Sequence, residues 1–216
     1  MTGQGMDSSP AHEALAADDA SSIAQQKTLL RAKLLACREK EPASKRAAAD
    51  ARIKTNLEAL PLFQAAQTVF CYVSTGAEVD TLSLLSALLA SSKTVCVPRC
   101  EGKGIMHAHK LTALSELQAA ALGIPAPPKE APLLDPRDID LIVVPCLASD
   151  LLGFRIGYGG AYYDRYLAAL PSGARPTTVT LCRESLLLET TPREAHDMPV
   201  AVVVTDKRVV FCKPVQ

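Results

Sequence analysis

Apolar residues recur every three or four positions in three segments of the chain, which is the spacing of a helix with one buried face. Pro42 separates the first two segments. Pro61 is expected to end the second, for which Ser44 is a candidate N-cap. The predicted helices and their inward residues are 23–38 with Ile23, Leu30, Leu34 and Cys37; 44–60 with Ala49, Ile53, Leu57 and Leu60; and 80–90 with Leu82, Leu85 and Leu89.

Shorter apolar runs are rich in Val, Ile, Thr and Phe, the residues that favour strands. The run that ends at Val144 is continuously apolar, as in a strand covered on both faces of its sheet. Five prolines within residues 125–136 indicate a surface crossing rather than a regular element. The predicted strands are 68–73, 94–98, 105–109, 140–144, 177–182, 199–204 and 209–212, and a further short helix is expected to end near Leu170.

Strands and helices alternate along most of the chain. We therefore predict an α/β fold of three layers, with a mostly parallel sheet and helices on both of its faces. The chain has 216 residues, of which 48% are hydrophobic, enough for one such domain at residues 23–216. Its apolar runs are far shorter than the eighteen or so residues of a membrane span, so no membrane partner is expected.

Charge is distributed unevenly along the chain. Residues 1–22 hold four acids and no Lys or Arg, and we expect them to form a disordered extension rather than a signal peptide or mitochondrial presequence. The remaining residues carry 23 basic and 19 acidic side chains, a net charge of +4. That excess suits a polyanionic small molecule and is too weak to suggest a nucleic-acid surface.

The seven cysteines are odd in number, form no Cys-x-x-Cys pair and fall mostly within apolar runs. Free buried thiols in a reducing compartment explain them better than disulfides or zinc, so we expect a cytoplasmic protein. His107 and His109 have no third potential ligand nearby in the sequence. We interpret them as packing or surface histidines rather than as a metal site.

The densest chemistry lies in residues 153–164, GFRIGYGGAYYD, between a predicted strand and a predicted helix. Loops of this kind bind phosphates, because backbone N–H groups approach the ligand and the helix end favours negative charge. This loop adds a cation (Arg155), three tyrosines and a carboxylate (Asp164). It lacks the lysine of a P-loop, and Tyr162 stands where a dinucleotide fingerprint needs its third glycine.

The same segment resembles the signature of the 5-formyltetrahydrofolate cyclo-ligase family. Shorter similarities lie outside it, at Lys27 and Arg31, at residues 74–81, at residues 97–99 and at residues 196–200. The resemblance as a whole spans roughly residues 26 to 206. The residues that match the central signature are Pro145, Asp150, Gly153, Arg155, Gly157, Tyr158, Gly159, Tyr162, Tyr163, Asp164, Arg165, Tyr166 and Leu167.

The resemblance implies ATP-dependent closure of 5-formyltetrahydrofolate to 5,10-methenyltetrahydrofolate, with release of ADP and phosphate. It implies Mg²⁺ as cofactor and ATP as co-substrate. We expect a monomer whose partners are the small-molecule substrates, 5-formyltetrahydrofolate and ATP. The implied ATP-binding residues are Lys27, Arg31, Arg155, Gly157, Tyr158, Gly159, Gly160, Ala161, Tyr162 and Tyr163. The implied substrate-binding residues are Val73, Glu78, Tyr158, Gly159, Gly160, Ala161 and Tyr162, and the implied metal ligands are Asp164 and Asp197.

Taken without the resemblance, several of these residues have simpler interpretations. Lys27 and Arg31, four positions apart, suit a solvated helix face. Glu78 suits a helix cap as well as a binding carboxylate, and Asp197 suits a turn. Of the paired tyrosines at 162 and 163, one would ordinarily pack inward while the other is exposed. Asp164 could merely complement a helix dipole or hold Mg²⁺.

The chain also departs from the family pattern. Ala161 stands where glycine is usual, Cys146 and Ser149 replace glycine and phenylalanine, and Ala201 replaces an acid. Two other functions stay open on the residues alone: a sugar-phosphate isomerase or transferase, which would turn over a phosphate ester without ATP, and a non-catalytic relative that binds folate, nucleotide or RNA. We find no aromatic–basic RNA-recognition motif in the sequence.

Overall fold

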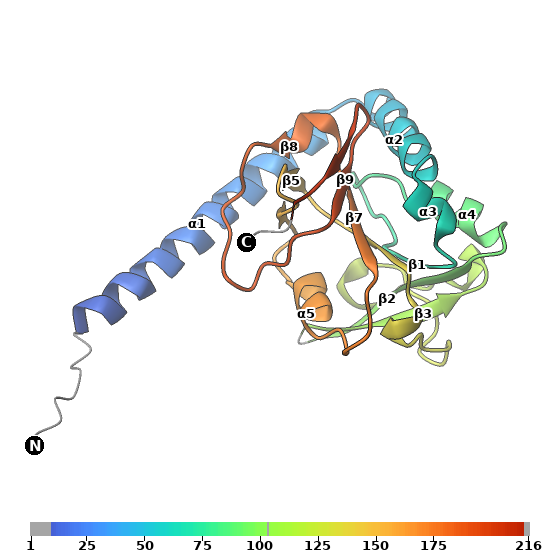
Figure 1. Cartoon of the computed structure of the whole chain (residues 1–216). Helices are drawn as coiled ribbons and strands as arrows, with labels where there is room; N and C mark the ends of the chain where they lie inside the picture. Colours follow the sequence, from blue (N-terminus) through green and yellow to red (C-terminus); the bar gives the residue numbers. More distant parts are fainter. Residues whose placement is uncertain (1–9, 103, 214–216) are drawn as a thin grey trace, which may run out of the picture.

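The computed structural model describes residues 10–102 and 104–213, and Figure 1 shows the arrangement of its elements. The helices are α1 (Pro10–Lys40), α2 (Ala43–Glu58), α3 (Pro61–Ala65), α4 (Leu82–Leu89) and α5 (Tyr162–Ala168). The strands are β1 (Thr68–Cys71), β2 (Thr94–Gly102), β3 (Ile105–Leu111), β4 (Leu141–Val144), β5 (Ala148–Asp150), β6 (Arg155–Ile156), β7 (Thr177–Leu181), β8 (Leu187–Leu188), β9 (Val202–Val204) and β10 (Val209–Phe211).

The main sheet has the strand order β10-β9-β7-β4-β1-β2-β3. Its five inner strands run parallel to one another, and β3 and β10 pair antiparallel at the two edges. Parallel neighbours need a crossover between them, which α4 supplies between β1 and β2. The mostly parallel sheet expected from the sequence is confirmed.

The two faces of this sheet are covered by different elements. Val69 and Leu141 belong to a core shared with α2, α3 and α4. Phe70 and Ile142 point the other way, into a second core with residues of α1, α5 and a smaller sheet. All four side chains are fully buried, and this two-sided burial is why the strands read as unbroken apolar runs. The predicted three layers, with helices on both faces, are confirmed.

The smaller sheet has the order β6-β5-β8 and was not expected from the sequence. Its hairpin β5–β6 turns at Gly153, where φ is +86°, and a Cβ there would lie 2.2 Å from the Val200 carbonyl oxygen. Glycine is therefore required at this turn. Arg155, which the sequence analysis places in a loop, lies on β6.

Helix α1 begins at Pro10 rather than at Ile23. The backbone of residues 10–22 is therefore helical where the sequence analysis expects disorder, and residues 1–9 of the expected extension lie outside the described residues. The segment is rich in alanine, the residue with the highest helix propensity, so it can continue the helix that follows. The domain boundary at residue 22 stays a prediction.

Two inward faces differ from those predicted. On α1, Cys37 is exposed and Arg38 is buried. On α4, Leu82 is exposed, whereas Leu84 and Leu88 are buried beside Leu85. Leucines occur at several helical spacings in α4, so its periodicity alone could not select the buried set.

The ends of α2 also differ from the prediction. The helix begins just after Pro42, Ser44 provides no cap, and the helix ends at Glu58. Pro61 then begins α3 instead of terminating α2, a position that suits proline because the first turn needs no N–H donor. Among the described residues, no helix combines the length and the apolar composition needed to cross a bilayer.

Candidate active site

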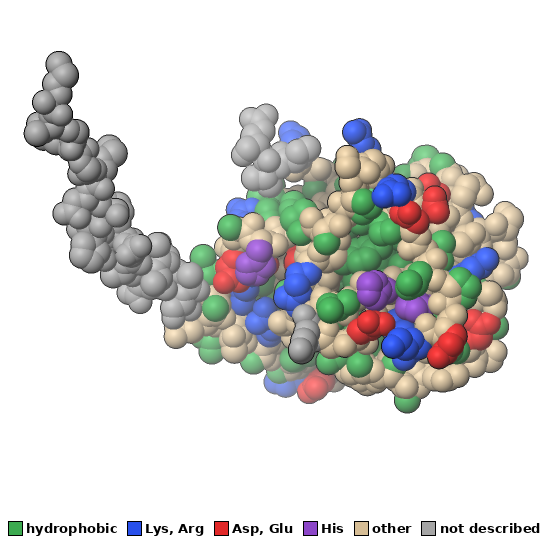
Figure 2. Space-filling view, turned by 90° about the horizontal axis from the view of Figure 1, so that it is seen from below, with side chains coloured by type: hydrophobic (Ala, Val, Ile, Leu, Met, Phe, Trp, Pro, Cys, Tyr) green, Lys and Arg blue, Asp and Glu red, His purple; other side chains and the backbone are tan. Residues whose placement is uncertain are grey.

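A cavity of about 440 Å³ opens beside the carboxyl ends of β1 and β4. Ligands of open parallel sheets commonly bind at this end of the strands. The space-filling view from below shows acidic, basic and histidine side chains intermixed on the body next to α1, with apolar side chains across the middle of the same face (Figure 2). The cavity brings together all the residues to which the sequence analysis assigns a site role: Lys27, Arg31, Val73, Glu78, Arg155, Gly157, Tyr158, Gly159, Gly160, Ala161, Tyr162, Tyr163, Asp164 and Asp197.

One face of α1 supplies two of the cations at this cavity, Lys27 and Arg31. Lys27 is buried, and its Nζ lies 2.7 Å from Glu194 Oε2 and 2.5 Å from Asp197 Oδ2. Arg31 donates from Nε to the Gly157 carbonyl at 2.9 Å. The solvated face that is the default interpretation of this spacing is therefore wrong for Lys27, which connects α1 to the loop of residues 194–197.

Arg38 continues this face and was missed in the sequence. It is buried, donates from Nη1 to the Tyr158 hydroxyl at 2.7 Å, and donates from Nη2 to the Cys146 carbonyl at 2.6 Å. A signal existed, because Arg38 follows Arg31 by seven positions, close to two helical turns, and so lies on the same face. The basic face of α1, defined as Lys27, Arg31 and Arg38, thus holds three loops of the site.

Tyr158 lies at the point where this basic face meets Glu78. Burial raises the pKa of the Tyr158 phenol, Arg38 opposes that rise, and the negative charge of Glu78 adds to it. The phenol therefore remains protonated at neutral pH. Because it accepts a hydrogen bond from Arg38, its own proton is available to a ligand or to Glu78.

The glycine loop, residues 157–161, presents its backbone to the cavity. Gly159 has φ of +98°, and Ala161, the residue before α5, has φ of +48° in the left-handed region. Because α5 is only seven residues long, the loop N–H groups and the cations attract an anion more than a helix dipole would. Ala161 stands where the family pattern has glycine. Its cost to stability lies in the left-handed backbone conformation as well as in the added methyl group.

The two tyrosines that open α5 have different environments. Tyr162 is partly exposed beneath the Arg165 guanidinium, 5.8 Å from the ring centre. Tyr163 stacks on Phe70 with ring centres 6.0 Å apart, and its hydroxyl is buried without a hydrogen-bond partner among the described residues. Both tyrosines are partly buried and both line the cavity, so the simple interpretation of one inward and one exposed tyrosine is wrong.

The two carboxylates expected to bind metal line the same cavity but have different partners. Asp164 Oδ1 accepts from Arg155 Nη2 at 2.8 Å and from the Met198 N–H at 3.1 Å. Arg155 also donates to the Met198 carbonyl. Asp197 instead groups with Glu194 and His196, whose potential ligand atoms all lie within 4.8 Å of one another.

These carboxylates fit Mg²⁺ by their chemistry. Magnesium prefers oxygen ligands, often one or two carboxylates together with waters and substrate phosphates. Asp164, Asp197 and Glu194 all line the cavity, whereas the nearby His196 ring offers a nitrogen that suits magnesium poorly. Glu194 was not singled out in the sequence, although it lies three residues before Asp197.

Glu78 lies in the loop that links β1 to α4. Its Oε2 accepts from the Thr75 N–H at 2.7 Å and from the Thr75 hydroxyl at 3.1 Å. The alternative that Glu78 caps α4 is wrong, because Asp80 accepts the Leu82 N–H at 2.9 Å and fills that role. Glu78 is thus a cavity carboxylate with one oxygen bonded to its own loop.

Other singled-out residues have structural roles. Asp150 is fully buried and accepts from Leu152, Phe154 and Thr191, so it fixes the β5–β6 turn. Ser149 donates to the Phe154 carbonyl at 3.0 Å within the same turn. Ala201, which stands where the family pattern has an acid, is exposed. His109 is buried with Nδ1 2.9 Å from the Ala131 carbonyl, which confirms a packing histidine.

Comparison with known proteins gives a consistent picture. A model of the 5-formyltetrahydrofolate cyclo-ligase family matches residues 23–206. The 5-formyltetrahydrofolate cyclo-ligase of Mycolicibacterium smegmatis is 32% identical over 190 residues, which cover 85% of this chain and 95% of that protein. The mitochondrial 5-formyltetrahydrofolate cyclo-ligase of Arabidopsis thaliana is 31% identical over 91% of this chain and 80% of its own length.

Solved structures agree. The NMR structure of 5,10-methenyltetrahydrofolate synthetase from Aquifex aeolicus matches with a TM-score of 0.77 and 31% identity, over 88% of this chain and 95% of that one. The synthetase from Mycoplasma pneumoniae matches with a TM-score of 0.67 at 18% identity, which supports the fold alone. With the family model matching most of the sequence, this chain belongs to the 5-formyltetrahydrofolate cyclo-ligase family.

Proposed function

We propose that this protein is an ATP-dependent 5-formyltetrahydrofolate cyclo-ligase that forms 5,10-methenyltetrahydrofolate, ADP and phosphate. The observation that carries the proposal is that one cavity unites the cations of α1 and β6, the glycine loop and the Glu78 carboxylate. Three cations and a row of backbone N–H groups suit a polyphosphate. A carboxylate and aromatic side chains at the same cavity suit a flat heterocycle with N–H donors.

The reaction needs ATP because a formamide carbonyl is a weak electrophile with a poor leaving group. In the first step the formyl oxygen attacks the γ-phosphorus, a P–O bond forms, and ADP leaves. In the second step the second folate nitrogen attacks the activated carbon and loses its proton, and the C–O bond breaks to release phosphate. Both steps depend on positioning and charge neutralisation rather than on a covalent protein nucleophile.

The residues of the cavity have complementary roles in this scheme. Lys27, Arg31 and Arg155 balance the phosphate charge, and each is held by a protein oxygen before ATP arrives. Charges that are already oriented need less rearrangement when the transition state forms. Glu78 and Tyr158 would accept from and donate to the pterin ring.

Asp164 and Asp197, with Glu194 beside Asp197, are the residues that would hold Mg²⁺. The ion would supply positive charge to the phosphate oxygens when bound. The single positive charge of Lys27 offsets part of the negative charge of Asp197 and Glu194 and so reduces the repulsion between these two carboxylates. Arg155 likewise offsets the negative charge of Asp164.

The decisive experiment is an absorbance assay for the methenyl product. Purified protein should convert 5-formyltetrahydrofolate only when ATP and Mg²⁺ are both present, and ADP should appear in equal amount. Equal product formation without ATP would exclude the cyclo-ligase assignment. Turnover of a sugar phosphate without ATP would favour the isomerase alternative, and tight folate binding without turnover would favour a non-catalytic relative.

We also propose that the enzyme works as a monomer on small molecules in the cytoplasm, without a nucleic-acid partner. All seven cysteines are free, as a reducing compartment permits. One relative is named as mitochondrial, so subcellular fractionation is the appropriate test of location. Light scattering on the purified protein tests the oligomeric state, and a dimer mass would overturn the monomer.

A further inference from the structure

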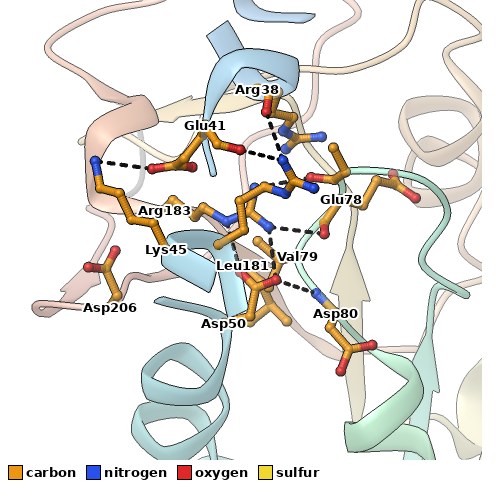
Figure 3. Close-up of polar contacts among 12 residues, drawn as sticks. Arg38, Glu41, Lys45, Asp50, Glu78, Val79, Asp80, Leu181, Arg183 and Asp206 are labelled. Atoms are coloured by element: carbon orange, nitrogen blue, oxygen red, sulfur yellow. Dashed lines mark hydrogen bonds and ion pairs between the residues drawn. The ribbon is translucent and has the colours of Figure 1, made fainter. Parts of the chain in front are cut away.

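A buried ion pair lies behind the loop that carries Glu78. Arg183 follows β7 and is 2% exposed, and Asp50 lies on α2 and is 8% exposed. Arg183 Nε donates to Asp50 Oδ1 at 2.8 Å and Nη2 donates to Asp50 Oδ2 at 2.8 Å, a bidentate pair (Figure 3). Neither residue lines the cavity, and the chemistry proposed above does not use them.

The rest of this pair's hydrogen bonds go to the Glu78 loop. Arg183 Nη1 donates to the Ala77 carbonyl at 3.0 Å, and Nη2 donates to the Glu78 carbonyl at 3.1 Å. Asp50 Oδ2 accepts from the Asp80 N–H at 3.1 Å. The pair therefore holds the backbone at Glu78 and on both sides of it, and Figure 3 shows the contacts with Glu78 and Asp80.

The loop has internal hydrogen bonds as well. Ser74 and Thr81 exchange hydrogen bonds of 2.9 and 3.0 Å at its two ends, and the Tyr72 hydroxyl donates to the Val79 carbonyl at 3.0 Å. These contacts close the loop on itself but join only residues close in sequence. Arg183 and Asp50 connect it to β7 and α2, and so set its position relative to the sheet.

We propose that Arg183, oriented by Asp50, is a positioning residue that places the Glu78 carboxylate for the folate. The inference rests on the proposed function. Buried ion pairs often add little net stability, because desolvation offsets their attraction. Here the guanidinium also donates to the backbone carbonyl of Glu78, the residue that would contact substrate, and to that of its neighbour Ala77. Displacing such a group by about 1 Å can cost about 100-fold in rate.

The experiment uses Arg183→Met in the full-length enzyme. The KM for 5-formyltetrahydrofolate should rise about tenfold or more, whereas the KM for ATP should change less than about twofold. The proposed ATP-binding groups come from α1, β6 and the glycine loop, and the hydrogen bonds that the Arg183 side chain makes with the described residues go instead to Asp50, Ala77 and Glu78. The decisive arm combines Arg183→Met with Glu78→Gln. If Arg183 acts through Glu78, it should add little to the folate KM of the Glu78→Gln enzyme.

Lys93 offers a matched control. It too donates to two backbone carbonyls, those of Gln64 at 2.8 Å and of Ala66, but at the opposite ends of β1 and β2. Lys93→Met should lower thermal stability and leave both KM values unchanged. If Arg183→Met proves insoluble, Arg183→Lys keeps the charge but not the planar set of donors, and should still raise the folate KM.

Three outcomes would overturn the positioning role. The first is an unchanged folate KM in Arg183→Met, or in Arg183→Lys if Arg183→Met is insoluble. The second is an equal rise in the KM values for folate and for ATP. The third is full additivity of the effects of Arg183→Met and Glu78→Gln on the folate KM. The proposed function fails separately, because it requires the wild-type enzyme to turn over. A wild-type enzyme without turnover would overturn both ideas, whereas an active wild type with a silent Arg183 variant would overturn only this one.

Discussion

Ala161 stands out among the individual residues, because an L-residue with a side chain holds a left-handed conformation at φ +48°. This conformation costs roughly 1–2 kcal/mol relative to an ordinary one. Glycine adopts it without that cost but loses about 0.4–1 kcal/mol more on folding from a freer unfolded chain. The balance favours glycine at this position.

We therefore expect Ala161→Gly to raise the free energy of unfolding by up to about 1.6 kcal/mol, measured by urea denaturation. The same change at Ala48, an exposed position inside α2, should lower it by about 0.5–1 kcal/mol. Destabilisation of similar size at both positions would show that Ala161 is not strained.

Asp164 is the residue whose metal role can be tested most directly. Asp164→Asn removes the negative charge but keeps an oxygen acceptor for Arg155 and Met198. We expect the Mg²⁺ concentration for half-maximal activity to rise several-fold. Thermal stability should be measured without metal, because a loss there would report the broken Arg155 pair. An unchanged magnesium titration would remove Asp164 from the metal ligands.

Among the elements, α1 joins separate parts of the site, because its basic face contacts the glycine loop and the loop of residues 194–197. Within this face, Lys27 lies between two carboxylates with 7% of its side chain exposed. A charge-assisted hydrogen bond contributes roughly 1.5–3 kcal/mol, or about ten- to a hundredfold in affinity.

Lys27→Met should accordingly raise the KM for ATP by about tenfold or more and lower the melting temperature, since Glu194 and Asp197 would lose their shared cation. Lys33→Met serves as control, because Lys33 is an exposed lysine of the same helix. It should change neither quantity. Equal KM values for the two variants would return Lys27 to a purely structural role.

At the scale of the whole molecule, the sheet gathers the site from distant parts of the chain. Among the residues whose side chains the structure describes, Lys27 is the first on α1 with a side-chain hydrogen bond to the body, and the family match begins at residue 23. Figure 1 shows the N-terminal part of α1 extending beyond the sheet and its covering helices.

Removing residues 1–22 should therefore leave the KM for both substrates unchanged and lower the free energy of unfolding by less than about 1 kcal/mol, because an isolated helical segment is marginal in water. Denaturation and kinetics of the shortened protein check this. A substantial loss of activity would assign the extension a role in the site.

The sequence by itself determined the architecture and most of the cavity. Apolar runs such as that of β4 predict strands buried on both faces, and the parallel sheet follows from their alternation with helices. The spacing of Lys27 and Arg31 places both on one helix face, and the glycine loop is recognisable from its residue composition. These features depend on local periodicity and residue type, which a sequence carries directly.

Only the tertiary structure decided which groups meet. Leu82 and Leu84 are the same residue type on the same helix. Packing against the sheet decides that Leu84 is buried and Leu82 is exposed. The two-residue strands β6 and β8 exist because β5 lies between them, and no period can form in so few residues. Arg183 and Asp50 pair across a separation of 133 residues. A buried charge is stable only where its partner is present, and the identity of that partner is set by the fold rather than by neighbours in sequence.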